Sequence, residues 1–125
     1  MSYEVNPMPV TPRVEVVESE GARVVTFKDR MVFDDRTVRE VGEQIGASLP
    51  NDGSPLRVVL DFAGVDLISS SLLGKLILLQ RRIDTSGGRL RLCELSPTVQ
   101  GVFRTSNLDR LFAIDRDRAA SLSAV

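Results

Sequence analysis

Three consecutive serines, Ser69, Ser70 and Ser71, stand directly before an apolar run that begins at Leu72. A serine hydroxyl can accept a backbone N–H at the start of a helix, which stabilises the helix by about 1 kcal/mol. A serine there can also carry a phosphate, because the helix start offers unpaired N–H groups and the positive end of the helix dipole. The residues alone favour capping, and both interpretations stay open at this point.

The run after the serines has the spacing of an amphipathic helix. Projected at about 100° per residue, most of its leucines share one sector, which we expect to pack on a sheet. The opposite sector, which we expect to face outward, holds Ser71, Lys75, Leu78 and Arg82. Leu78 lies near the serines on this sector and is the predicted apolar anchor for a partner.

Two aspartates flank the loop that leads to the serines. Asp61 closes an apolar stretch, residues 56–62, and is predicted to be a structural turn acceptor. A receiver domain keeps its phosphoaccepting aspartate at the end of a central strand. It also needs an acidic pair after its first strand and a lysine at the end of a late strand, and the sequence has neither at those places. Asp66 is either a solvated loop charge or part of a docking rim, and the sequence does not separate the two.

The composition excludes several classes of function. The chain has 125 residues, 16 Lys plus Arg, 17 Asp plus Glu, a net charge of −1, no His and one Cys. Without His there is no Ser-His-Asp triad and no His-ligated metal site. The charge balance does not suit nucleic acid, and there is no apolar run of about 18 residues for a membrane span. We expect a soluble, cytoplasmic, non-enzymatic protein with no cofactor and no metal.

The hydrophobic periodicity predicts an α/β fold with a mixed four- to five-stranded sheet and about four helices. Residues 13–17 and 22–27 form a hairpin, residues 38–49 a helix, and residues 56–62 and 89–93 two further strands. Gly87 and Gly88 end the helix after the serines with residues that accept positive φ. A short helix follows Ser96-Pro97, then an edge strand within 108–114 and a frayed helix over 116–122. We expect a flexible tail over 1–12, one domain over 13–118 and a frayed tail over 119–125.

The stretch Asp61–Gly74 resembles the signature of the STAS domain, as found in bacterial anti-sigma factor antagonists, and the likeness covers about residues 13–115. By this resemblance Ser70 is the phosphoacceptor. Asp61, Gly74, Gly87 and Gly88 are predicted to be structural. The family usually has Asp immediately before the acceptor and Gly two residues after it, where this sequence has Ser69 and Leu72. The predicted partner-binding residues are Asp34, Asp66, Ser69, Ser71, Lys75, Leu78 and Arg82, with Asp34 matching a family aspartate near the acceptor.

The resemblance implies a partner and a switch. The partner is a serine-kinase anti-sigma factor of the histidine-kinase-like ATPase fold, which otherwise holds a sigma factor inactive. Phosphorylation of Ser70 by this kinase would end the binding, and a phosphatase would restore it. The alternative is a non-phosphorylated scaffold or assembly subunit that forms a homo-oligomer, in which the serines only cap the helix.

Overall fold

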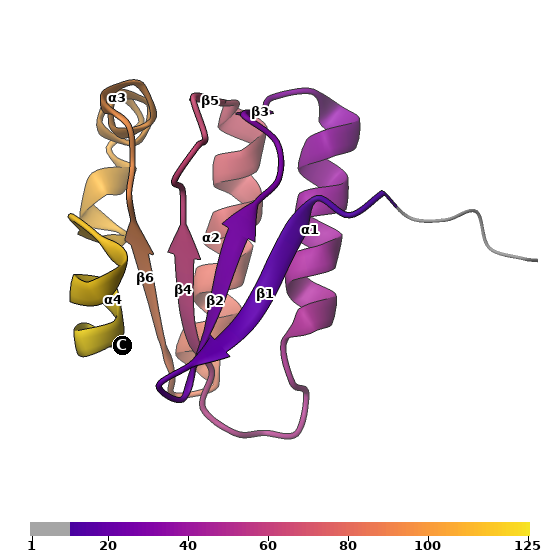
Figure 1. Cartoon of the computed structure of the whole chain (residues 1–125), viewed down its shortest axis with the longest axis vertical. Coiled ribbons are helices and arrows are strands. Elements are labelled where there is room, and N and C mark those ends of the chain that lie inside the picture. The colour runs from indigo at the N-terminus through magenta and orange to yellow at the C-terminus, as the bar shows by residue number, and fades with distance from the viewer. Residues whose placement is uncertain (1–10) are drawn as a thin grey trace, which may run out of the picture.

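A five-stranded mixed sheet runs through the centre of the computed structural model, which describes residues 11–125 (Figure 1). Its strands are β1 (Val14–Ser19), β2 (Ala22–Phe27), β4 (Arg57–Asp61), β6 (Arg89–Cys93) and β7 (Ala113–Asp115). The spatial order is β1-β2-β4-β6-β7, with β1 antiparallel to β2 and the other neighbours parallel. The predicted fold class and hairpin are confirmed. Residues 1–10 of the expected tail lie outside the described residues.

Four α-helices cover the sheet. They are α1 (Asp35–Ser48), α2 (Ser70–Thr85), α3 (Pro97–Thr105) and α4 (Arg118–Ala124). Helices α1 and α2 lie side by side on one face, α4 lies on the other, and α3 packs beside β5 at the end of the sheet where the parallel strands terminate (Figure 1). None of the helices in residues 11–125 is long and apolar enough to cross a membrane.

The central strand β4 is buried on both faces, as its continuous apolar sequence requires. Because side chains alternate along a strand, Val58 and Leu60 join the large core beneath α1 and α2, while Val59 joins a smaller core beneath α4. Just after β4, Phe62 packs on Phe27 with ring centroids 4.7 Å apart and meets Phe103 edge-on at 6.4 Å. This aromatic cluster fixes the end of the sheet from which the serine loop departs.

The two glycines after α2 are needed for different reasons. Gly87 has a φ of +78°, as expected for a residue that ends a helix. Gly88 does not have the positive φ expected of it; a Cβ there would lie 1.8 Å from the carbonyl oxygen of Leu56. That oxygen accepts the N–H of Arg89 at 2.8 Å, so the close approach starts β6 beside β4.

A two-residue strand pair was not predicted. Strand β3 (Met31–Val32) pairs in parallel with β5 (Leu67–Ile68) and forms a second, separate sheet. Two-residue strands are too short to show a period in the sequence. The expected edge strand within 108–114 is likewise shorter, because a 3₁₀ turn (Leu108–Arg110) precedes β7.

The prediction of a frayed C-terminal tail over 119–125 is wrong. This segment lies in α4, where Ser121 is fully buried and Val125 is 9% exposed. The Arg118 guanidinium donates to the buried carboxylate of Asp61 at 2.7 Å, and the Ser121 hydroxyl donates to Asp115, also at 2.7 Å. These bonds to β4 and β7 hold the short helix on the sheet.

Candidate partner-binding site at the start of helix α2

The start of α2 is positioned by the pair β3–β5. The Asp66 N–H donates to the Arg30 carbonyl at 2.7 Å, and the Ser69 N–H donates to the Val32 carbonyl at 3.1 Å. Immediately beyond Ser69 the chain turns into α2, whose Leu72 is fully buried in the core. The serines are therefore held between a hydrogen-bonded strand and a core leucine, so their positions are fixed although their side chains lie at the surface.

The serine hydroxyls do not cap α2. Ser69 occupies the N-cap position with an extended backbone, yet its side chain accepts no backbone N–H. Instead its hydroxyl oxygen lies 2.9 Å from that of Ser71. Ser70 is exposed and its hydroxyl makes no hydrogen bond within residues 11–125. The structure thus differs from the capping interpretation, because the two flanking hydroxyls bond to each other rather than to the helix backbone.

The other three α-helices of the described chain have side-chain caps. Asp34 caps α1 by accepting the Thr37 N–H at 3.0 Å, Ser96 caps α3 by accepting the N–H of Val99 at 3.2 Å, and Asp117 caps α4 in the same way at 2.9 Å. The first backbone N–H groups of a helix have no partner within the helix and lie at the positive end of its dipole. In α2 the Leu72 N–H donates to the Ser69 carbonyl at 3.2 Å rather than to a side chain. Among the α-helices of residues 11–125, α2 alone begins without a side-chain cap.

The predicted aspartates near the serines already have local partners. Hydrogen bonds from Thr37, by its side chain and its backbone N–H, keep the pKa of the Asp34 carboxyl below its usual value. Asp66 forms an exposed ion pair with Arg30, with a nitrogen–oxygen distance of 2.7 Å. Asp61 is buried and accepts the Ala63 N–H at 2.9 Å, the geometry of an Asx turn. Asp34 and Asp66 lie at the surface near the serines, whereas Asp61 does not.

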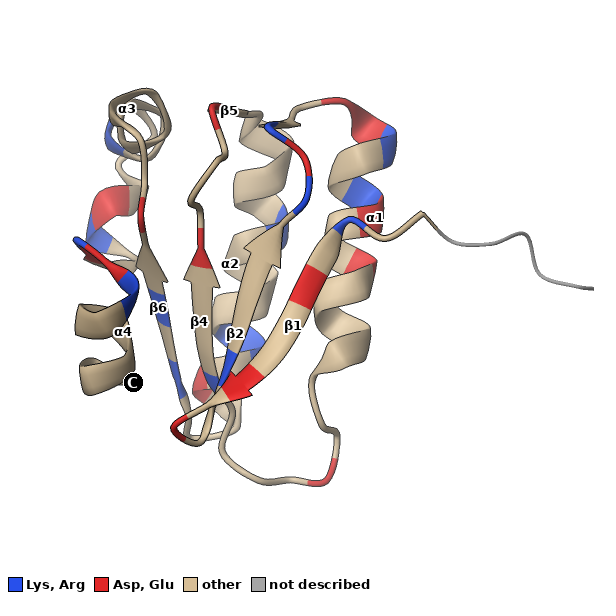
Figure 2. Cartoon of the chain, viewed as in Figure 1, with Lys and Arg blue, Asp and Glu red and all other residues tan. Residues whose placement is uncertain are grey.

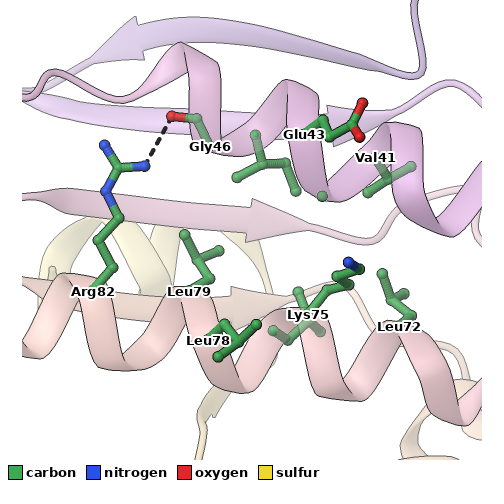
Figure 3. A pocket seen from close by; sticks show the side chains of 11 residues that line it. Val41, Glu43, Gly46, Leu72, Lys75, Leu78, Leu79 and Arg82 are labelled. Carbon is green, nitrogen blue, oxygen red and sulfur yellow. Dashed lines mark hydrogen bonds between the residues drawn. The ribbon is translucent and has the colours of Figure 1, made fainter.

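The sector expected to face outward from α2 partly faces α1. Gly42 and Gly46 on α1 leave a groove of about 290 Å³ between the helices (Figure 3). The stem of Lys75 lies against Gly42, and Arg82 reaches across to donate to the Gly46 carbonyl at 2.9 Å. The prediction of an outward Arg82 is therefore wrong. Gly46 has no side chain, so the Arg82 guanidinium can reach its carbonyl oxygen on α1. Leu78 remains exposed, as predicted, at 61%.

Gly74, predicted to be structural, has no steric requirement in the described chain. A Cβ on Gly74 would meet no atom within 4 Å, and the residue lies exposed in the interior of α2. Sequence reasoning also missed two exposed apolar residues beside the site: Met31 is 56% exposed and Phe33 is 52% exposed. The sequence feature that could have shown them is the apolar triplet Met31-Val32-Phe33 between charged residues. In an extended chain, alternate residues of such a triplet face opposite sides, so one side chain is buried and two are exposed.

Comparison with known proteins gives the family. Residues 31–120 match the family model described as "Mlab, STAS domain". BtrV of Bordetella bronchiseptica, a protein named as an anti-sigma factor antagonist, is 37% identical over 84 residues, which are 66% of this chain and 72% of BtrV. The chain belongs to the STAS domain family. It is of the anti-sigma factor antagonist type, as the resemblance implied, and such antagonists are non-enzymatic regulators.

Solved structures show the same fold. An anti-sigma-factor antagonist (STAS) domain protein from Planctomyces limnophilus superposes with a TM-score of 0.82 at 21% identity, covering 89% of this chain and 96% of that one. The anti-sigma factor antagonist SpoIIAA, in its unphosphorylated form, superposes with a TM-score of 0.67 at 19% identity, covering 86% and 91%.

Proposed function

We propose that this protein binds a serine-kinase anti-sigma factor of the histidine-kinase-like ATPase fold, releases its sigma factor, and is switched off by phosphorylation of Ser70. The observation that carries the proposal is the exposed, unbonded Ser70 hydroxyl at the uncapped start of α2. ATP and Mg²⁺ belong to the kinase. Because sigma factors act in the cytoplasm, the proposal places the protein there.

The start of α2 suits a phosphate. A phosphoserine adds about −1.5 to −2 charges and three acceptor oxygens. Backbone N–H groups that no side chain caps can donate to those oxygens, and the helix dipole favours the charge. The modification is therefore compatible with the fold, so a phosphatase that removed the phosphate would return the protein to its binding state.

The phosphate would act on the interface rather than on the fold. In the unmodified protein the surface at the serines carries uncharged hydroxyls. Removing these hydroxyls from water when a partner covers them costs little free energy. A buried phosphate that finds no positive partner costs several kcal/mol. Asp34, two residues beyond the carbonyl that holds Ser69, would add like-charge repulsion. One covalent change thus converts a surface that can be buried into one that stays solvated.

The scaffold alternative has less support. It assigned the serines a capping role, and the Ser69 side chain makes no cap hydrogen bond. Leu72, which stands where the family usually has Gly, is fully buried and fixes the first turn of α2. Neither feature favours a self-assembling subunit over a phosphorylated antagonist.

Affinity capture from a lysate of the source cells tests the proposal. Wild type, Ser70→Ala and Ser70→Glu serve as baits, and Thr98→Glu, an exposed position in the first turn of α3, controls for added charge at a helix start. We expect wild type, Ser70→Ala and Thr98→Glu to retain an anti-sigma factor with an ATPase fold, and Ser70→Glu to lose it. Retention of the same factor by Ser70→Glu would contradict the switch.

A further inference from the structure

We infer that the outer face of the strand pair β3–β5 is the apolar centre of the surface that binds the anti-sigma factor, and that the factor presents an apolar contact bordered by basic side chains. The β3–β5 patch is formed by the exposed Met31 in β3, the exposed Phe33 directly after β3, and the half-buried Leu67 opposite Met31 in β5. The inference rests on the proposed function and identifies the part of the surface that supplies affinity.

The exposure of the patch is unusual for this chain. Five large apolar residues are exposed in the described part, and Met31 and Phe33 are two of them, separated by a single residue. Between them Val32 is fully buried, and its partner Ile68 is 2% exposed, so the pair is anchored in the core from below. The alternation along residues 31–33 leaves the side chains of Met31 and Phe33 exposed on either side of the buried Val32. Apolar groups that are held rigidly at the surface are typical of binding sites.

The patch adjoins the proposed phosphoacceptor. Met31 lies opposite Leu67 in the parallel register, and the ladder ends where the Ser69 N–H donates to the Val32 carbonyl at 3.1 Å. Phe33 and Ser70 each follow one residue beyond this last hydrogen bond. Figure 1 shows β3 and β5 together at the end of the domain where α2 begins. A partner that covers the Ser70 hydroxyl at this edge also meets the patch.

Charges around the patch indicate the chemistry of the partner. On one side Arg30 and Asp66 neutralise each other in an ion pair of 2.7 Å. On the other side Asp34 and Asp35 follow Phe33 directly, both exposed and without an ion pair in residues 11–125. Hydrogen bonds from Thr37 lower the pKa of the Asp34 carboxyl further below neutral pH. Figure 2 shows this acidic stretch at the start of α1. The complementary surface carries Lys or Arg opposite the two aspartates.

The patch also explains why one phosphate suffices as a switch. A phosphate on Ser70 would lie at the border of apolar side chains and on the same edge as Asp34 and Asp35. It would keep water at the centre of the contact and would compete for the basic groups that the aspartates attract. Leu78, the apolar anchor predicted from the sequence, lies about two helical turns along α2 from Ser71, outside this border.

Binding measurements on variants test the inference. The probe is the purified anti-sigma factor that wild type retains in the capture experiment, and calorimetry gives its Kd for each variant. We expect Phe33→Ser to weaken binding by about tenfold or more, as for central interface residues, and Met31→Ser to weaken it by a smaller factor. Leu111→Ser, which removes another apolar side chain of similar exposure, 48% against 52%, is the matched control and should leave Kd unchanged.

A second arm tests the charge. Asp35→Asn should weaken binding and reduce its dependence on salt, because a screened attraction to basic groups is lost. The outcomes separate the two proposals. If Ser70→Glu loses the factor while Phe33→Ser binds it as tightly as wild type, the patch inference is wrong and the proposed function stands. If wild type retains no anti-sigma factor, both are wrong. Equal losses for Leu111→Ser and Phe33→Ser would also overturn the patch inference.

Discussion

The hydroxyl oxygen of Ser69 lies 2.9 Å from that of Ser71, and this pairing leaves Ser70 between them with an unbonded hydroxyl. The same pairing withdraws Ser69 from the capping role that its position would otherwise give it. Two properties therefore follow from one contact: the helix start keeps its backbone N–H groups free of side-chain caps, and one serine of three is available for modification.

The cap assignments can be tested by stability measurements. Ser96→Ala removes a cap that accepts the Val99 N–H and should lower the free energy of unfolding by about 1 kcal/mol. Ser69→Ala removes only an exposed contact between two hydroxyls. It should change the free energy of unfolding by less than about 0.5 kcal/mol. Urea unfolding gives both values. An equal loss for the two variants would show that Ser69 caps α2 after all.

The ion pair between Arg118 and Asp61 should control access to Cys93. The thiol is fully buried, and this burial, with the nearby Asp61 charge, raises its pKa to about 12. Arg118→Ala leaves the Asp61 carboxylate buried without its charged partner, which should loosen α4 and speed reaction of the thiol with a disulfide reagent at pH 8. Arg116→Ala, an exposed arginine without an ion pair in residues 11–125, is the control. Equal rates for the two variants would contradict the role of the ion pair.

Acid should weaken the attachment of β7 through Asp115. The carboxylate accepts two hydrogen bonds from Arg91, at 2.9 and 2.7 Å, and these bonds, with a further one from Ser121, lower the pKa of Asp115. A lowered folded-state pKa means that the ionised group stabilises the fold above about pH 4 and loses this effect as the pH falls through the folded-state value. Asp115→Asn should therefore lower the free energy of unfolding by about 2 kcal/mol at pH 7.

The pH dependence of that loss is the informative quantity. The difference in unfolding free energy between wild type and Asp115→Asn should shrink as the pH is lowered below about 4, because wild type then also loses the charge. Asp109→Asn, at an exposed residue with no ion pair in the described chain, should show little difference at any pH. A loss for Asp115→Asn that is independent of pH would contradict the ionic contribution.

Two glycines should respond oppositely to alanine. Gly74→Ala adds a methyl group into open space in a helix interior and should raise the free energy of unfolding by about 0.5 to 1 kcal/mol. Gly88→Ala would place its Cβ 1.8 Å from the Leu56 carbonyl oxygen, so β4 and β6 must separate locally and stability should fall. Thermal unfolding of the two variants distinguishes them, and a destabilised Gly74→Ala would indicate a contact that the structure lacks.

The sequence predicted those elements whose hydrophobic period is long enough to read. The hairpin, α1, α2, β4 and β6 lie where alternation or helical spacing placed them, because each buries one face in the large core. It failed where tertiary contacts decide. Strand β3 has only two residues and was not predicted. The last helix was predicted over 116–122 and lies at Arg118–Ala124, but its attachment through Asp61, Asp115 and the buried Val125 was not predicted.

The candidate site was predicted only in part, because some of its features depend on tertiary contacts rather than on local sequence. The place of Ser70 at a helix start follows from local sequence, as does the exposure of Leu78. The bond from Arg82 to Gly46 depends on how α1 lies against α2, which no local pattern encodes. Likewise, a projection of α2 alone cannot show that Phe33 directly follows the short strand β3, whose last carbonyl accepts the Ser69 N–H.

The most direct test of the central claim is to map the phosphate. The purified protein is incubated with the anti-sigma factor retained by wild type, together with ATP and Mg²⁺, and its peptides are sequenced by mass spectrometry. The account predicts a single phosphate on Ser70 in wild type and none in Ser70→Ala. A phosphate on Ser69 or Ser71, or no phosphate on a protein that binds the factor, would contradict it.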